Sequence, residues 1–320
     1  MPMMNQSELA VVFFAENLTP SQVPLYQSLR VLGSKAKTVV ITNSEIAEIW
    51  ACEVDEVIVV KFSSLGLIPK SLRKVQRKFG FIRNFIGALL SIANQRHNHL
   101  LATFSMPLVN SRYYYYLEWS QRNPDLFAIY LDSRDMIFQV RPEEIFAGFS
   151  DCNSIHLFDE WKFDLRQKNL NTLGQSQINS LWLEQLTINL PQIDRYKLKD
   201  YPVINGGGIA GPGFSAIAFF QEVIGLFEKS GVSRAFTIDQ AALNVIARSI
   251  YKGKMIVNRN SEVVYNMLST SPDFQITFED EKILVNGRLV PILHMFDRFG
   301  AYKNGRLTLN QGSLEILQAQ

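Results

Sequence analysis

Short apolar runs rich in β-branched residues alternate with helical patterns along the first third of the chain. The strand-like runs are Leu9–Ala15, Lys37–Thr42 and Glu56–Lys61, and the helical stretches between them are Pro24–Leu32 and Ile46–Cys52. Continuous apolar strands separated by helices are typical of a parallel sheet that is covered on both faces. We therefore expect an α/β fold with a Rossmann-type, mostly parallel sheet and right-handed crossovers, in a strand order that the pattern leaves open.

The rest of the chain adds further apolar segments. A predicted helix over Val109–Gln121 contains the run Tyr113–Tyr116. Four consecutive tyrosines cover all sides of a helix, so we expect most of them in the core rather than on a stacking surface. The other predicted elements are strands at Leu126–Leu131 and Ile155–Phe158, helices at Ser176–Glu184, Ala216–Glu228 and Asp239–Ile250, and a hairpin with an Asn286-Gly287 turn.

One uncharged stretch, Tyr201–Gln221, is long enough to span a bilayer at about 20 residues. Its five glycines and two prolines exclude a regular helix in its first half. We interpret it as a loop that enters a buried helix, which leaves no transmembrane segment. One domain over residues 1–320 with a C-terminal extension is the expected organisation.

Charge is distributed unevenly along the chain. The formal net charge of +2 argues against a dedicated nucleic-acid-binding protein. Residues 57–117 nevertheless hold nine Lys or Arg and no Asp or Glu, which leaves 23 basic and 30 acidic residues elsewhere. This asymmetry predicts that one face meets an anionic partner, which is a nucleotide, a phosphorylated acceptor, a membrane surface or the acidic remainder of the fold.

The basic segment also has a helical pattern. Apolar residues at helical spacing form one stripe from Leu72 to Ala93, and basic residues lie roughly opposite it. The basic residues that could contact a membrane surface are Lys70, Arg73, Lys74, Arg77 and Lys78. Two interpretations stay open, namely an element that contacts a membrane surface and an ordinary surface helix docked on the sheet.

Cysteine usage and the N-terminus bear on the compartment. Cys52 and Cys152 form neither a disulfide framework nor a zinc site. The sequence MPMMNQSELA lacks a basic region followed by an apolar core, so it does not resemble a signal peptide. We expect a cytoplasmic protein, with peripheral contact at the inner face of a membrane if the basic segment binds lipid.

Two aspartates follow the predicted strand LFAIYL directly. Asp132 and Asp135 therefore stand at the carboxyl end of a strand, where open parallel sheets bind their ligands. Mg²⁺ and Mn²⁺ prefer oxygen ligands and accept substrate phosphates into their coordination shell. The pair favours a cation bound together with a diphosphate, and the alternative is an Asx turn that closes the strand.

Four short motifs in this order resemble the GT-A class of nucleotide-sugar-dependent glycosyltransferases. They are YLDSRDMIFQ (130–139), NGGGIAG (205–211), TIDQAALN (237–244) and HMFDR (294–298). The resemblance implies a GT-A-like domain with a nucleotide-binding half at 1–140 and an acceptor-binding half at 141–320. It also implies metal-dependent transfer of a sugar from a nucleoside-diphosphate donor to an acceptor hydroxyl of a glycan or lipid-linked molecule, as in the synthesis of surface glycans or polysaccharides.

The resemblance assigns the first two motifs to the donor. Asp132 and Asp135 would meet the ribose and the metal-bound diphosphate, although their D-x-x-D spacing departs from the usual D-x-D and leaves open which of them holds the metal. Arg134 would contact the donor or a neighbouring carboxylate. The residues Asn205, Gly206 and Gly207 would form a turn against the donor sugar, where glycine permits close approach.

The later motifs are assigned to the acceptor and the metal. Asp239 would act as a general base or as a positioning group, but it also fits the first turn of a helix with a Thr237–Gln240 capping box. His294 would complete a Mn²⁺ or Mg²⁺ shell with Asp132 and Asp135, the alternative being a hydrogen-bonded core histidine. Arg298 and its neighbour Asp297 would orient His294 or contact the diphosphate.

Other classes fit the sequence less well. A sugar-phosphate nucleotidyltransferase should have a glycine-rich basic loop after the first strand, where this chain has AENLTPSQ. A haloacid-dehalogenase-type phosphatase should have its aspartates after the first strand, and Asp132 comes too late. The remaining alternative is a non-catalytic GT-A-like protein that docks to a membrane or partner through its basic segment.

Overall fold

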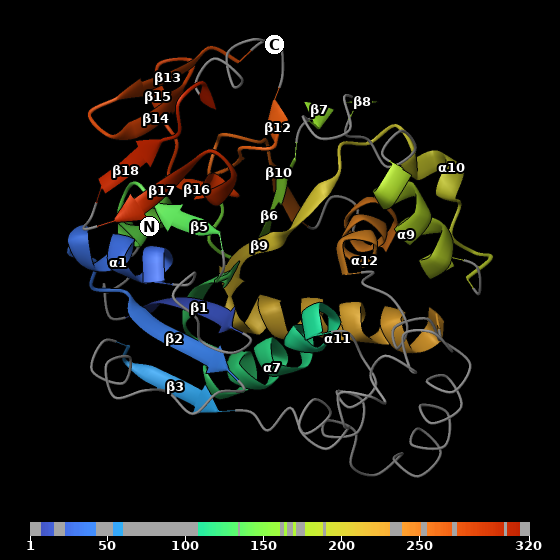
Figure 1. The fold of residues 1–320 in the computed structure, drawn as a ribbon. Coiled ribbons are helices and arrows are strands. Elements are labelled where there is room, and N and C mark those ends of the chain that lie inside the picture. The colour runs from blue at the N-terminus through green and yellow to red at the C-terminus, as the bar shows by residue number, and fades with distance from the viewer. Residues whose placement is uncertain are drawn as a thin grey trace, which may run out of the picture.

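A computed structural model of the chain describes thirteen stretches of the sequence (Figure 1). They are residues 8–15, 23–42, 54–59, 108–133, 135–160, 163–164, 169–170, 177–187, 190–230, 239–250, 255–270, 274–303 and 306–313. A mixed α/β architecture with a mostly parallel seven-stranded sheet at its centre confirms the expected fold class.

The central sheet has the strand order β10-β6-β9-β4-β1-β2-β3. Its strands are β1 (Leu9–Ala15), β2 (Lys37–Thr42), β3 (Glu56–Val59), β4 (Phe127–Asp132), β6 (Ile155–Asp159), β9 (Ile204–Pro212) and β10 (Met255–Asn258). Neighbouring strands are parallel except at β9, which is antiparallel to both β4 and β6. The apolar runs predicted for β1 and β2 have the observed bounds.

Helices cover both faces of the sheet, as the continuous apolar strands predict. Along β1, Ala10 and Val12 pack towards one face with the helices α7 (Leu108–Arg122), α11 (Gly213–Ser230) and α12 (Asp239–Val245). Val11 and Phe13 pack towards the other face with α1 (Val23–Val31) and α8 (Pro142–Gly148). In Figure 1, α7 and α11 run beside each other along the sheet.

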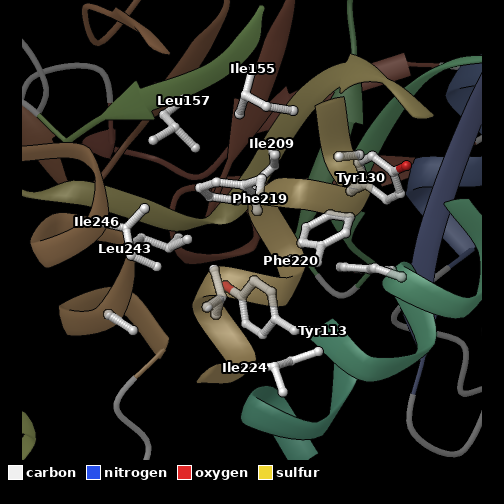
Figure 2. Packing of buried hydrophobic residues seen from close by; sticks show 14 of the residues in the cluster. Tyr113, Tyr130, Ile155, Leu157, Ile209, Phe219, Phe220, Ile224, Leu243 and Ile246 are labelled. Carbon is white, nitrogen blue, oxygen red and sulfur yellow. The ribbon is translucent and has the colours of Figure 1, made fainter. Parts of the chain in front are cut away.

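The tyrosine run of α7 belongs to the core. Tyr113, Tyr114 and Tyr116 are at most 2% exposed. The ring of Tyr113 lies 6.0 Å from that of Phe220 and 5.8 Å from that of Phe227, both on α11. Figure 2 shows Tyr113 and Phe220 among the apolar side chains below the sheet. This packing confirms the core interpretation and fixes the helix that carries Arg112.

The glycine-rich stretch forms a strand, so the prediction of a loop there was wrong. Residues 204–212 form β9, and α11 follows immediately. A Cβ at Gly208 would lie 2.9 Å from Phe158 Cδ2, and one at Gly211 would lie 2.6 Å from Ile155 Cδ1. Large side chains of the neighbouring strand β6 therefore occupy the space that side chains of β9 would need, which explains glycines inside a strand.

The C-terminal part builds small sheets beside the central one. β5 (Met136–Phe138) and β11 (Val264–Asn266) flank β16 (Ile292–His294), while β13 (Ile276–Glu279), β14 (Lys282–Val285) and β15 (Arg288–Leu289) form a meander. Asn286 and Gly287 have φ of 54° and 71°, which confirms the predicted tight turn between β14 and β15. Another hairpin pairs β17 (Gly300–Lys303) with β18 (Arg306–Leu309).

Short elements complete the described fold. They are β7 (Phe163–Asp164), β8 (Asn169–Leu170), β12 (Ser269–Thr270), α9 (Gln177–Thr187), α10 (Arg195–Leu198), the π-helix η3 (Ile246–Ile250) and the 3₁₀ helix η4 (Phe296–Arg298). The π-helix η3 continues α12, so the predicted helix Asp239–Ile250 is present with a change of winding at Ile246.

Several predictions lie outside the described residues. The helix expected at Ile46–Cys52 and the whole stripe from Leu72 to Ala93, with its basic neighbours from Lys70 to Lys78, belong to this part. The docking function assigned to the basic segment therefore stays a prediction, as does the expected cytoplasmic location. Within the thirteen stretches, no helix combines the length and the apolar character needed to cross a membrane.

Candidate functional site

The order of the strands places a topological switch point at the carboxyl ends of β1 and β4. The chain passes from β1 through α1 to β2 on one side, and β4 lies on the other side of β1. Such a switch point is where open α/β sheets bind ligands. Asp132 at the end of β4 is paired in register with Phe14, and Ser133 Oγ donates to the carbonyl oxygen of Phe14 at 2.9 Å. The acidic motif therefore begins at the switch point.

Several other elements have an end at this edge of the sheet. Because β9 runs antiparallel to β4, with Gly208 opposite Leu131, its first residues lie beyond the end of β4. The strand β16 pairs with β5 so that His294 lies opposite Met136, next to Asp135. Motifs that are far apart in the sequence thus converge on one place.

The first group of side chains consists of Arg112, Asp132 and Asp239, here called the Arg112 group. Arg112 Nη1 donates to Asp132 Oδ1, and Arg112 Nη2 donates to Asp239 Oδ2 at 2.6 Å. Nη2 also donates to the carbonyl oxygen of Gly206, on β9. One guanidinium from α7 thereby joins the end of β4, the start of α12 and the start of β9.

Burial sets the electrostatics of the Arg112 group. Arg112 is 2% exposed, and burial opposes its charge, but Asp132 and Asp239 hold the pKa of the guanidinium well above its ordinary value. Burial also raises the pKa of Asp239, and the nearby Arg112 offsets only part of this rise. The side chain of Asp132 is 36% exposed against 8% for Asp239, so Asp132 is the member of the group that faces solvent.

The second group consists of Asp135, Asn205 and His294, here called the His294 group. His294 Nε2 lies 3.4 Å from Asp135 Oδ1, and His294 Nδ1 lies 2.8 Å from Asn205 Nδ2. The backbone N–H of Gly207 donates to Asn205 Oδ1, which turns the amide nitrogen of Asn205 towards the ring. The neutral ring then accepts at Nδ1 and carries its proton on Nε2, facing Asp135.

The charge of His294 depends on its neighbours. Burial opposes a positive ring, but Asp135, with smaller contributions from Asp132 and Glu160, raises the pKa of His294 above its ordinary value. The charged ring would also carry a proton on Nδ1, which faces the Asn205 amide donor. Protonation of His294 therefore requires Asn205 to turn its Oδ1 towards the ring.

The backbone of β9 separates the two groups. A Cβ at Gly206 would lie 3.0 Å from Asp239 Oδ2 and 3.4 Å from Arg112 Nη2. A Cβ at Gly207 would lie 2.9 Å from Asn205 Oδ1 and 3.1 Å from His294 Cε1. Successive residues of a strand face opposite sides, so one glycine adjoins each group. These glycines belong to a strand and not to the predicted turn, and side chains of the protein itself lie against them.

Most of the predicted site residues lie in these two groups or next to them. Arg298 Nη2 is 3.8 Å from Asp135 Oδ2, and its Nη1 donates to Asp297. Arg298 is thus placed near Asp135, and its predicted role in orienting His294 or contacting the diphosphate stays a prediction. Arg134 and Thr237 lie outside the described residues, so the predicted role of Arg134 and the capping box at Asp239 stay predictions.

Among the residues with described positions, no three His, Cys, Asp or Glu side chains are arranged to hold a metal ion. Asp132 pairs with Arg112. The predicted metal-ligand set of Asp132, Asp135 and His294 stays a prediction. Asp135 and His294 remain compatible with one cation, because two ligands with bonds of about 2.1 Å lie at most about 4.2 Å apart.

Two residues of the site were not predicted from the sequence. Arg112 counted only as part of the basic segment, although a charge directly before a buried tyrosine run signals a buried ion pair. Glu160 is 9% exposed and directly follows Asp159 at the end of β6. An acid that directly follows an apolar strand, as Asp132 follows LFAIYL, is the signal that could have identified Glu160.

Searches for similar proteins add no assignment. No protein-family model matches the chain, and no curated protein matches it. Interpretation of the site therefore depends on its geometry. Buried ionisable groups with shifted pKa values, gathered at the switch point of a sheet, are typical of a functional site.

Proposed function

We propose that the chain is a glycosyltransferase of the GT-A type, which moves a sugar from a nucleoside-diphosphate donor to an acceptor hydroxyl. One observation carries the proposal. The four motifs that resemble the GT-A class, spread from residue 130 to residue 298, bring polar side chains to a single switch point of an α/β sheet, and three of the motifs contribute ionisable ones. A ligand-binding site is expected at this place on general grounds.

The His294 group is the proposed place for the donor diphosphate. Asp135 and His294 would hold a Mn²⁺ or Mg²⁺ ion together with phosphate oxygens, and the cation would neutralise the charge that develops on the leaving diphosphate. To act as a ligand, His294 must release the proton from Nε2, and Asn205 must turn to accept from Nδ1. Arg298 is 39% exposed beside Asp135, so its guanidinium can contact the diphosphate from the solvent side.

The Arg112 group is the proposed place for the reacting hydroxyl. Asp239 is 5% exposed, and burial raises its pKa, which makes its carboxylate a better proton acceptor than an ordinary aspartate. Arg112 fixes the direction of this carboxylate through Oδ2. Asp239 would take the proton of the acceptor hydroxyl in an inverting reaction, or orient the sugar in a retaining one.

Transfer and hydrolysis of a panel of nucleotide sugars test the proposal. Wild type is incubated with UDP-, GDP- and ADP-linked sugars with and without Mn²⁺, and release of the nucleoside diphosphate is followed by a coupled assay. We expect one donor to be consumed in the presence of metal and to raise the melting temperature. Asp135→Asn should lose this activity, whereas Glu118→Gln, which changes an exposed carboxylate on α7, should retain it. If no donor is consumed and none stabilises the protein, the proposal is wrong.

A further inference from the structure

Arg112 distributes its hydrogen bonds unequally around the site. Its two terminal nitrogens contact Asp132, Asp239 and Gly206, whereas its Nε is buried and has no hydrogen-bond partner among the described residues. The side chain of Arg112 is 3% exposed. The guanidinium therefore lies between a carboxylate that faces solvent and one that is buried.

Stability alone is a poor reason for such a group. Removing an arginine and two carboxylates from water costs free energy, and apolar replacements of buried ion pairs are often as stable or more stable. An unpartnered Nε adds to the cost. The planar fork of arginine is suited to holding two carboxylates in a fixed arrangement, which the compact ammonium of lysine cannot reproduce.

We propose that Arg112 is a positioning residue that links Asp132 to Asp239, so that a ligand that contacts Asp132 changes the orientation of Asp239. This inference rests on the proposed function, in which Asp239 meets the acceptor hydroxyl, and on the donor contact that the GT-A resemblance implies for Asp132. The side chain of Arg112 is 3% exposed against 36% for Asp132, so Asp132 offers a ligand more surface than Arg112 does. When Asp132 loses its charge, Arg112 loses one of its anchors, and the orientation of Asp239 changes with it.

A double-mutant cycle measures the link. Asp132→Asn, Asp239→Asn and the double variant are compared with wild type by kcat/KM for the donor that wild type uses. We expect the combined loss to be smaller than the product of the single losses by on the order of tenfold, within the range for residues in one ion-pair network. If the double variant of the otherwise wild-type chain loses as much kcat/KM as the product of the two single losses, the inference is wrong.

The same cycle in an Arg112→Lys background identifies Arg112 as the link. A lysine keeps the charge but lacks the planar fork that fixes the directions of both carboxylates, so the two losses should multiply to within about twofold. If Arg112 only stabilises the fold, Arg112→Lys should lower the melting temperature but leave the coupling between the Asp132→Asn and Asp239→Asn losses unchanged. Coupling that persists in the Arg112→Lys background would therefore contradict the role of Arg112. The matched control is an Arg122→Lys background, which changes an exposed arginine of the same helix and should leave the coupling intact.

The inference can fail independently of the proposed function. If wild type consumes no nucleotide sugar, the proposed function fails, and the cycle is measured on the free energy of unfolding in urea. Coupling of Asp132 and Asp239 that disappears with Arg112→Lys would then still support the link, and additive effects would overturn it. If Arg112→Lys does not fold, Arg112→Gln takes its place, and the cycle in the wild-type background remains decisive.

Discussion

The two charged groups on either side of β9 balance their negative charge in different ways. In the Arg112 group, one buried guanidinium bonds two carboxylates, so the cation is part of the protein. In the His294 group, a carboxylate faces a histidine whose charge depends on pH, and the 39% exposed side chain of Arg298 places its Nη2 3.8 Å from Asp135 Oδ2. In the proposed reaction, the first group uses Arg112 as its cation, whereas the second would hold a metal ion bound from outside. This difference assigns the two groups different tasks in the proposed reaction.

The largest effect is expected from removing the built-in cation. Arg112→Met leaves Asp132 and Asp239 near each other without a positive partner, and Asp239 is buried. We expect the free energy of unfolding to fall by about 3–5 kcal/mol, the cost of breaking a buried pair by removing one partner. Urea denaturation at neutral pH measures this value.

Arg122→Met is the matched control, because Arg122 is an exposed arginine of α7 paired with Glu118. Its effect should stay below about 1 kcal/mol. Equal effects of the two substitutions would mean that the charge of Arg112 is not needed to balance the two carboxylates, and the contrast between the groups would be lost.

The glycines of β9 allow each group to be disturbed separately. An alanine at Gly207 would press on Asn205 and Met136, and an alanine at Gly206 would press on Asp239. We expect each to lower the free energy of unfolding by about 1–3 kcal/mol, as overpacking does. Only Gly207→Ala should also shift the NMR signals of the His294 ring strongly.

Gly225→Ala is the control for these substitutions, since a Cβ there meets no atom within 4 Å in α11. It should raise the free energy of unfolding by about 0.5–1 kcal/mol, because alanine favours a helix over glycine. A shift of the His294 signals as large in Gly206→Ala as in Gly207→Ala would show that β9 does not separate the groups.

A smaller effect is expected from pH. The pKa of His294 is raised in the folded protein, because the attraction of Asp135 outweighs burial. The resulting stabilisation is fully present below the ordinary pKa of about 6.5 and is lost as the pH rises through the raised value. The free energy of unfolding of His294→Gln should therefore lie furthest below that of wild type at about pH 5, and the difference should shrink towards pH 8.

His156 provides a comparison of opposite sign. Burial lowers the pKa of His156, so the folded state disfavours its charged form and wild type loses stability as the pH falls. The amount by which the free energy of unfolding of His156→Gln falls below that of wild type should therefore grow from about pH 5 to pH 8. Urea denaturation at a series of pH values checks both trends, and parallel trends for the two histidines would contradict the account of the His294 group.

Sequence patterns predicted those parts of the fold that neighbouring residues determine. The apolar runs of β1 and β2 and the turn at Asn286-Gly287 are local signals. The strand β9 was missed because its glycines carry no apolar pattern. Its packing instead comes from Phe158 and Ile155 on β6, which the local sequence of β9 does not contain.

The site was predictable as a set of residues but not as an arrangement. Asp132, Asp135, Asp239 and His294 were named from their motifs, but the protein side chain that pairs with Asp132 was not. That partner is Arg112, which lies 20 residues from Asp132 and 127 from Asp239 in the sequence. Such a contact follows from the crossing of α7 with the sheet, and no spacing in the sequence encodes it.

The division of tasks between the two groups is tested most directly by titration of Mn²⁺ with UDP or GDP present, followed by the electron paramagnetic resonance of free Mn²⁺. Asp135→Asn should weaken Mn²⁺ binding by about tenfold or more, because a proposed ligand is lost. Asp132→Asn should leave the affinity within about threefold of wild type, because Arg112 already balances the Asp132 charge. If wild type binds no Mn²⁺, or if Asp132→Asn weakens binding as much as Asp135→Asn, the account is contradicted.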